Sequence, residues 1–248
     1  MSEISLVGGL LLGSLAGVTH VGMAAIQNAD VVLHPGDWTG PALQAACGPR
    51  LESGRSLTLD DVFAAAETVS RLVVLYCGAP PIATGRGDAF PSALRLRQML
   101  REAGHTAEVV PGISAVQAAA LEAGLDLCTA ARPGLTMVSL EHPPSGLRTL
   151  RAAAQTDAAI ALMWFEDHAR ASLAVLHEER PDQLLTLVRN LGGDNVDVLR
   201  GTTSDLAPHL ARLPAPAVLF SQVAGEHAET RRYGLASKRE GDNGPDGS

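Results

Sequence analysis

Short apolar segments alternate along the chain with longer segments in which apolar residues recur every three or four positions. The short segments have the length and composition of buried strands, and the longer ones have the periodicity of helices packed on one side. The expected strands are residues 4–7, 31–34, 72–76, 108–110, 135–140, 158–165, 184–188 and 217–220. The expected helices are residues 19–29, 59–70, 91–103, 114–123, 145–155, 169–179 and 203–213. This alternation predicts an α/β protein with a largely parallel sheet.

One break in the pattern indicates a division of the chain. Pro111 and Gly112 interrupt it sharply, and the next segment, ISAVQAAALEAGL, has the small residues of a helix that packs closely on a sheet. We therefore predict an N-terminal α/β domain over residues 1–112 and a C-terminal α/β domain over residues 113–234. The last segment, residues 235–248, is polar and rich in glycine, and we expect it to be disordered.

The composition argues against two classes of binding partner, nucleic acids and membranes. The chain has 248 residues, a net charge of −8 and 3% aromatic residues, and its Lys and Arg residues form no dense cluster. Nucleic-acid binding needs a basic surface or a set of stacking aromatic residues, so we expect no nucleic-acid partner. No apolar run reaches the roughly 18 residues that a membrane-spanning helix needs, so we expect no membrane partner either.

Cysteine usage and the first residues bear on localisation. Cys47, Cys77 and Cys128 are far apart and odd in number, which is typical of a reduced cytoplasmic protein. The apolar start ISLVGGLLLGSLAG follows Glu3 with no Lys or Arg before it. We therefore interpret it as a strand and a glycine-rich loop rather than a signal peptide, and expect a cytoplasmic protein.

Three glycine-containing corners follow expected strands. They are residues 6–19 (LVGGLLLGSLAGVT), 77–80 (CGAP) and 109–116 (VVPGISAV), the last with Ser114 at the start of a helix. Glycines let backbone N–H groups approach a ligand, and α/β proteins bind ligands beyond the carboxyl ends of their strands. An ordinary turn is the favoured interpretation of the first and third corners taken alone. For the second corner, a turn and a pocket wall are equally supported.

Side chains for acid–base or metal chemistry are sparse. The eight His residues show no HExxH pair or other ligand spacing, so we expect no metal site. The segment MWFEDHAR, residues 163–170, reads first as a strand followed by an acidic helix start. Its alternative is a pocket wall with a titratable group at the rim. No serine has a GxSxG context, which argues against a hydrolase.

Taken in order, these segments resemble the tetrapyrrole methylase family, the S-adenosylmethionine-dependent methyltransferases of the corrin and sirohaem pathways. Residues 100–125, LREAGHTAEVVPGISAVQAAALEAGL, resemble the family's LREAGIPFEVVPGVSSALAA. Residues 17–33, GVTHVGMAAIQNADVVL, resemble LLTLRALRAIREADVVL, and residues 187–206 resemble the family's VVRNAGRPGERVVRGTLAEL. The resemblance covers nearly the whole chain.

The resemblance implies two α/β domains with S-adenosylmethionine bound in the cleft between them, a small-molecule acceptor and a homodimer. CGAPPI stands where the family has the cofactor loop GGDPxI. Three further positions match cofactor contacts of the family: the pair after Pro-Gly, a Met at the end of a strand and the residue after Arg-Asn. The cofactor-binding residues carried over in this way are Cys77, Gly78, Ala79, Ile82, Ser114, Ala115, Met163 or its neighbour Trp164, and Leu191.

The sequence departs from the family in two loops. The family's GAGPGD is VGGLLLGSL here, and its Gly-Asp-Pro is Gly78-Ala79-Pro80, so both loops lose their carboxylate. A base is needed only if the acceptor must lose a proton. The resemblance therefore leaves the catalytic residue unassigned. The titratable candidates are Asp88, Glu166, Asp167 and His168.

These departures leave three functions open. We expect a S-adenosylmethionine-dependent methyltransferase that acts on a non-standard acceptor, either a specialised metabolite or a modified tetrapyrrole. The first alternative is a precorrin-type C-methyltransferase of corrin biosynthesis. The second is a degenerate, non-catalytic protein that binds the cofactor or a tetrapyrrole. The intact VVPGISA segment favours an enzyme, whereas the lost acid favours the degenerate protein.

Overall fold

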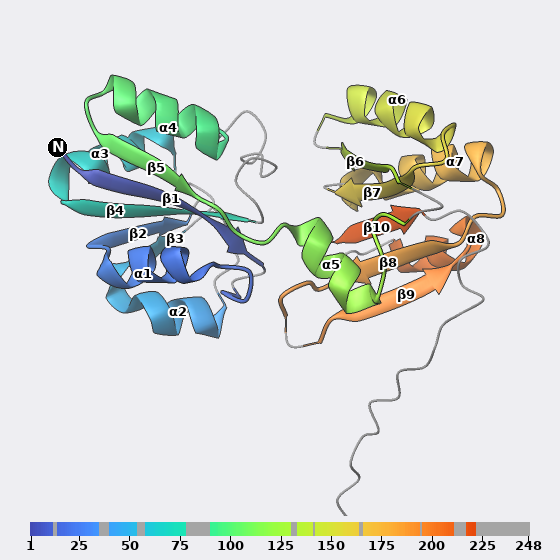
Figure 1. Ribbon diagram of the computed structural model, residues 1–248, viewed down its shortest axis with the longest axis horizontal. Coiled ribbons are helices and arrows are strands. Elements are labelled where there is room, and N and C mark those ends of the chain that lie inside the picture. The colour runs from blue at the N-terminus through green and yellow to red at the C-terminus, as the bar shows by residue number, and fades with distance from the viewer. Residues whose placement is uncertain are drawn as a thin grey trace, which may run out of the picture.

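The computed structural model contains two five-stranded sheets, one formed by each half of the chain (Figure 1). The residues that the structure describes are 1–11, 14–34, 40–53, 58–77, 90–129, 133–140, 142–163, 166–193, 195–210 and 217–221. Within these ranges no helix has the length and apolar composition needed to cross a bilayer. None of the three cysteines forms a disulfide.

The first sheet is parallel throughout and has the order β3-β2-β4-β1-β5. Its strands are β1 (Glu3–Leu10), β2 (Val31–His34), β3 (Leu51–Ser53), β4 (Arg71–Cys77) and β5 (Thr106–Val110). Its helices are α1 (His20–Asn28), α2 (Pro41–Cys47), α3 (Leu59–Thr68) and α4 (Ala93–Glu102), with a 3-10 turn η1 (Gly48–Arg50). Separate apolar clusters lie on the two faces, one beneath α3 and α4 and one beneath α1 and α2.

The second sheet has the order β6-β7-β10-β8-β9. Its strands are β6 (Leu135–Ser139), β7 (Ala159–Met163), β8 (Leu185–Arg189), β9 (Asp197–Gly201) and β10 (Val218–Ser221). Helices α6 (Pro143–Ala154), α7 (Ala169–Glu179) and α8 (Thr203–Leu206) cover one face, and α5 (Ala115–Ala123) covers the other. Two 3-10 turns, η3 (Glu166–His168) and η4 (Ala207–Leu210), precede α7 and follow α8.

The predicted α/β class is confirmed, but the predicted largely parallel sheet holds only for the first half. In the second sheet β6 and β7 are parallel, whereas β7–β10, β10–β8 and β8–β9 are antiparallel. A short turn joins β8 to β9, and a connection this short can only pair strands antiparallel. The alternation of strands and helices carries no information about strand direction. The antiparallel pairs of the second sheet could therefore not be predicted from the sequence pattern.

The eight expected strands and seven expected helices are all present, most within one or two residues of their predicted bounds. Three elements were missed: β3, β9 and α2. β3 has only three residues, and most of β9 is half-buried, so neither gives a clear apolar run. The domain boundary between residues 112 and 113 stays a prediction, although α5 packs on the second sheet. The segment 235–248 lies outside the described residues.

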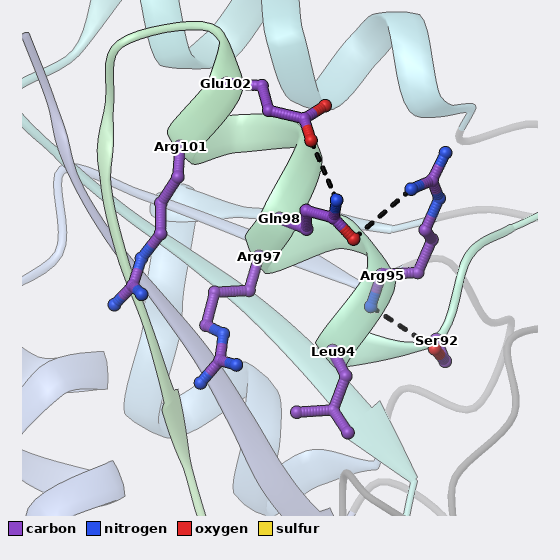
Figure 2. A pocket seen from close by; sticks show the side chains of 7 residues that line it. All are labelled: Ser92, Leu94, Arg95, Arg97, Gln98, Arg101 and Glu102. Atoms are coloured by element: carbon purple, nitrogen blue, oxygen red, sulfur yellow. Dashed lines mark hydrogen bonds between the residues drawn. The ribbon is translucent and has the colours of Figure 1, made fainter.

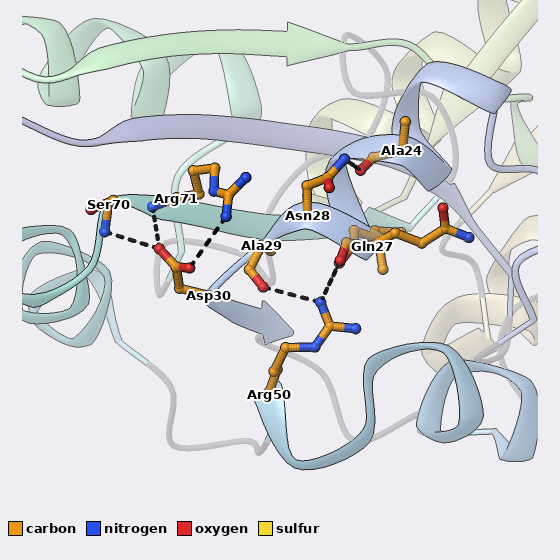
Figure 3. Close-up of polar contacts among 9 residues, drawn as sticks. Ala24, Gln27, Asn28, Ala29, Asp30, Arg50, Ser70 and Arg71 are labelled. Atoms are coloured by element: carbon orange, nitrogen blue, oxygen red, sulfur yellow. Dashed lines mark hydrogen bonds and ion pairs between the residues drawn. The ribbon is translucent and has the colours of Figure 1, made fainter.

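The connection between α1 and β2 is held by Arg50, which follows α2 (Figure 3). Its guanidinium donates to carbonyls at the ends of two helices, where the last turn leaves carbonyls without helical partners. The acceptors are the carbonyl oxygens of Ile26, Gln27, Ala29, Ala46 and Cys47, at 2.9–3.0 Å. Arg50 therefore fixes the position of both helices on the first sheet.

We expect Arg50→Met to lower the free energy of unfolding by about 2–3 kcal/mol, because carbonyls at two helix ends lose a charged donor. Urea denaturation followed by circular dichroism measures the loss. The matched control is Arg95→Met on α4. The guanidinium of Arg95 is exposed, and Figure 2 shows it hydrogen-bonded to Gln98, at 3.3 Å. The control should change stability by less than about 0.5 kcal/mol. Equal losses in the two variants would contradict this role of Arg50.

Candidate functional site

The carboxyl ends of β1, β4 and β5 in the first sheet face those of β7 and β8 in the second. β1, β4 and β5 are parallel, so Leu10, Cys77 and Val110 end at the same edge of the first sheet. β7 and β8 are both antiparallel to β10, so they also run in one direction and end at one edge of the second sheet. A β-carbon added to Gly192, just after β8, would lie 2.3 Å from the carbonyl oxygen of Leu11, just after β1. The two edges therefore meet, and we call this region the junction.

Three glycines pack their backbones together on the first-sheet side of the junction. A β-carbon on Gly9 would lie 2.0 Å from the Gly17 carbonyl oxygen, and one on Gly112 would lie 2.2 Å from both the Gly8 carbonyl carbon and the Gly9 nitrogen. Gly9 also has φ +97, a conformation that favours glycine. No larger residue fits at either position without moving backbone, so the corners 6–19 and 109–116 form one tight structure.

Hydrogen bonds hold this structure closed. The Ile113 N–H donates to the Gly17 carbonyl at 2.9 Å, and the Thr19 hydroxyl donates to the Pro111 carbonyl at 3.1 Å. The same Thr19 hydroxyl accepts from the Gly22 N–H at 3.3 Å and caps α1. The start of α1 is thus tied to the end of β5, and this link fixes where α5 begins.

A pair of backbone hydrogen bonds follows β1. Leu11 and Ser14 exchange these bonds, which are 3.1 and 2.7 Å long and form an isolated antiparallel bridge. The Leu11 side chain is 4% exposed and belongs to the apolar cluster of the second sheet, which also contains Val116, Met163 and Leu191. A leucine from the first half of the chain therefore completes the core of the second half.

The start of α5 also faces this region. Ser114 is buried and caps the helix, because its hydroxyl accepts from the Gln117 N–H at 3.1 Å while the Gln117 side chain accepts from the Ser114 N–H. Ala115 is the first helical residue and packs partly against the same apolar cluster as Leu11. The capping box keeps the first turn of α5 in a single conformation.

The turn after β8 has an unusual backbone. Asn190 has φ +58, and its side-chain amide donates to the Asn195 carbonyl at 2.7 Å. The Gly193 N–H donates to the Asn190 carbonyl at 3.0 Å, and Gly192 has φ +89. These bonds set the path of the main chain at Leu191, whose side chain is 2% exposed. The sequence reasoning missed Asn190 and Gly192, and the signal was the pair of glycines that begins three residues after the end of β8.

The structure brings four of the sequence-predicted cofactor residues to the junction. Ser114 and Ala115 start α5. Met163 is the last residue of β7, Leu191 follows the end of β8, and the two share one apolar cluster. Cys77 ends β4, in register with Leu10 of β1. The predicted residues Gly78, Ala79, Ile82 and Trp164, and the candidate base Asp88, lie outside the described residues.

Tyr76 links the two ends of the segment that carries several of these residues. Its hydroxyl donates to the Pro91 carbonyl at 3.0 Å, so the end of β4 is joined directly to the start of α4. Burial beneath α4 raises the pKa of Tyr76 above its ordinary value and keeps the phenol neutral. The hydroxyl therefore remains a donor at any physiological pH.

The described candidate bases lie at the edge of the junction. Of the candidate bases, Asp167 is exposed and His168 is half-buried on η3, beyond the end of β7, and Glu166 begins the same turn. Arg189, next to Asn190, is paired with Asp197 through bonds of 2.8 and 2.5 Å. Within the described ranges, no three His, Cys, Asp or Glu residues are grouped so that they could hold a metal ion.

A separate cavity of about 740 Å³ lies on the outer face of α4 (Figure 2). Its described lining residues all belong to α4 or its cap: Ser92, Leu94, Arg95, Arg97, Gln98, Arg101 and Glu102. Arg95 contacts Gln98, and Arg101 donates to the Ala107 carbonyl at the outer edge of β5 at 2.9 Å. The cavity contains none of the residues at the junction and is not part of the candidate site.

The family of the chain follows from its sequence profile. The profile of the tetrapyrrole (corrin/porphyrin) methylases matches residues 4–207, and the chain therefore belongs to this family. Membership makes it a methyltransferase whose cofactor is S-adenosylmethionine. No curated protein sequence matches the chain.

Three solved structures with the same fold are those of corrin or porphyrin methyltransferases. A cobalt precorrin-4 methyltransferase is 19% identical, with a TM-score of 0.75 over 89% of this chain and 94% of that one. A uroporphyrin-III C-methyltransferase from Thermus thermophilus is 25% identical, with a TM-score of 0.68 over 90% and 92% of the two chains. Another Thermus thermophilus structure, of a uroporphyrin-III C-methyltransferase complexed with S-adenosylhomocysteine, is 18% identical, with a TM-score of 0.71 over 89% and 97%.

The predicted family, the two-domain α/β fold, the enzyme class and the cofactor are thus confirmed. The junction fits such a cofactor, because it combines the N-terminal end of α5 with an apolar wall. The residues that contact the cofactor stay predictions.

We expect Gly112→Ala to lower the free energy of unfolding by about 1–3 kcal/mol, because its β-carbon would meet backbone rather than a movable side chain. It should also weaken binding of S-adenosylhomocysteine, since the two corners must separate. Urea denaturation and isothermal titration measure the two effects. The control is Gly134→Ala, where the added carbon would lie 3.3 Å from the Ala158 side chain, away from the junction. Unchanged stability and affinity in Gly112→Ala would show that the corners do not need their close packing.

Proposed function

We propose that the chain transfers the methyl group of S-adenosylmethionine to a small molecule other than the standard corrin-pathway tetrapyrroles. One observation carries this proposal: Leu11, Met163 and Leu191 give the junction an apolar wall, and Arg189, the cation that ends β8, is paired with Asp197. Leu11, Ser14, Met163 and Leu191 line the junction together with the corner 110–114. A tetrapyrrole with several carboxylates needs cationic partners, and this wall offers none. Ala79 stands where the family has an acid, and this departure from the family motif also favours a non-standard acceptor.

The proposed cofactor-binding residues keep the assignment made from the sequence. Ser114 and Ala115 lie at the start of α5, where free backbone N–H groups favour a carboxylate such as that of the cofactor. Met163 and Leu191 supply an apolar surface for the rest of the molecule. The full proposed set is Cys77, Gly78, Ala79, Ile82, Ser114, Ala115, Met163, Trp164 and Leu191.

The chemistry asks little of this chain beyond positioning. Bound S-adenosylmethionine supplies a methyl group already activated by the positive charge on sulfur. The protein must hold the acceptor atom in line with that methyl group and keep water away, and such orientation can supply about 7–11 kcal/mol of barrier reduction. The tight corners and the apolar cluster at the junction suit both tasks. An acceptor that needs little help from a base would fit a loop that has Ala79 where the family has an acid.

A precorrin-type C-methyltransferase is the second candidate. The observation that favours it is the likeness to a cobalt precorrin-4 methyltransferase over 89% of this chain. The two proposals differ in the acceptor and agree on the cofactor, so only an acceptor experiment separates them.

We expect isothermal titration to detect binding of S-adenosylhomocysteine. The melting temperature of the protein should rise with the concentration of this ligand. A ligand at about 100 times its Kd stabilises the folded state by about 2.7 kcal/mol. No binding at millimolar ligand would contradict the enzyme proposal and favour a degenerate protein.

The acceptor is tested with S-adenosylmethionine carrying a labelled methyl group and with uroporphyrinogen III as the polycarboxylate probe. We expect no transfer to this probe beyond that of a heat-inactivated control. Transfer would favour the corrin-pathway alternative, and it would leave the cofactor result unaffected.

We also propose that the enzyme is a homodimer, as its family resemblance implies. Exposed apolar side chains around α5 support this, since Leu121 is 81% exposed and Ile113 is 46% exposed. Burying such side chains against a second copy would remove them from water.

We expect light scattering with size-exclusion chromatography to give the mass of a dimer for the native chain. Leu121→Glu should shift the population towards monomer, because dimerisation would then bury a carboxylate that has no partner, and removing that charge from water is costly. The control is Leu94→Glu, a 44% exposed leucine on α4, which should leave the mass unchanged. A monomeric native chain would contradict the proposal directly.

A further inference from the structure

We propose that the outer face of α4 binds a small multivalent oxyanion through Arg97 and Arg101. This site is separate from the junction, and the inference does not depend on the proposed function. It assigns a ligand to the cavity of about 740 Å³ whose described lining residues belong to α4 and its cap. A cavity of this volume is in the range of small-molecule sites.

Helical spacing places the two arginines on one side of α4. Arg97 and Arg101 are four positions apart, and Leu94 precedes Arg97 by three, so their side chains are neighbours on the helix surface. Figure 2 shows all three extending to the same side of the helix, whereas Arg95 extends to the other. Leu94 is 44% exposed and adds an apolar contact. The two guanidinium groups can therefore approach one ligand together.

One hydrogen bond orients the guanidinium of Arg101. Its Nε donates to the Ala107 carbonyl oxygen on β5 at 2.9 Å. Its two terminal nitrogens form no hydrogen bond within the part of the chain that the structure describes. The N–H groups of a guanidinium form a planar fork that matches the oxygens of a carboxylate or a phosphate. Because Nε is already bound, less side-chain freedom is lost when an oxyanion binds to this fork.

Among the described residues, no carboxylate neutralises the two arginines. Arg97 is half-buried and forms no hydrogen bond or ion pair within the described ranges. The one acid in the described lining is Glu102, and its carboxylate accepts from the Gln98 amide at 2.8 Å. Three arginines elsewhere do have carboxylate partners: Arg71, Arg151 and Arg189. The face of α4 therefore keeps a positive charge that a bound anion would neutralise.

The overall charge of the protein favours a small ligand. The net charge is −8, so a long polyanion such as a nucleic acid would be repelled outside the cavity. The few arginines of α4 would also neutralise only a small part of its phosphates. An oxyanion with two or three charges avoids both costs. Phosphate esters and polycarboxylates share this chemistry, since a guanidinium binds either group in the same bidentate geometry.

Isothermal titration at low ionic strength tests the site with two probes, inorganic tripolyphosphate and citrate. We expect the native chain to bind at least one of them, and added NaCl to weaken the binding because salt screens exposed charges. The tighter probe identifies the source of the oxyanion as phosphate or carboxylate. Arg97→Gln should weaken binding by about tenfold through the loss of a charge-assisted contact. This variant should fold normally, since Arg97 forms no bond within the described ranges.

The matched control is Arg148→Gln on α6, which changes the net charge by the same amount. Arg148 is exposed and is not one of the residues that line the cavity. Its replacement should leave the affinity for the probe within about twofold of the native value. Arg101→Gln is a second test and should also weaken binding by about tenfold. Circular dichroism checks its folding, because this variant also loses the bond to Ala107.

Three results would overturn the inference. A native chain that binds neither probe has no oxyanion site on α4. Equal losses of affinity in Arg97→Gln and Arg148→Gln would show a general effect of charge rather than a site. Light scattering gives the third result. If Arg97→Gln lowers the mass of the native assembly, this face contacts an acidic surface of a second copy instead of a small ligand. None of these results bears on cofactor binding at the junction.

Discussion

The close backbone contact among Gly9, Gly17 and Gly112 is the constraint on which the candidate site depends. It brings the chain after β1 against the chain after β5, and a hydrogen bond from Thr19 to Pro111 secures the contact. The position of α5 follows from it, because α5 begins at Ala115, three residues after Gly112. Since α5 covers one face of the second sheet, the same contact also sets how the second half meets the first.

Much of this fold is predictable from apolar periodicity alone. Long regular segments such as α4 and α7 were located to within a few residues, since their apolar stripes are unambiguous. The direction of β10 was not predictable, because a strand of four buried residues reads the same in either orientation. The three-residue β3 is recognised only through its pairing with β2, a contact that no local pattern encodes.

The candidate site was predictable only in part, for a similar reason. Resemblance to the family identified Ser114, Ala115, Met163 and Leu191, and the structure brings these residues to one junction. Leu11 was seen only as a member of a glycine-rich loop. Its importance depends on burial among residues more than a hundred positions away, and an apolar residue beside glycines carries no local sign of such a contact.

The placement of α5 has a consequence for how the molecule folds. In a doubly wound sheet the helix after β5 would return over its own sheet, but here it packs on the next one. On the first sheet, Ser5 and Glu108 remain on the surface and hydrogen-bond to each other at 3.1 Å. Meanwhile the core of the second sheet includes Leu11, supplied before any of its own strands is synthesised. The two halves are therefore interlocked, and neither can reach its full stability before the other has folded.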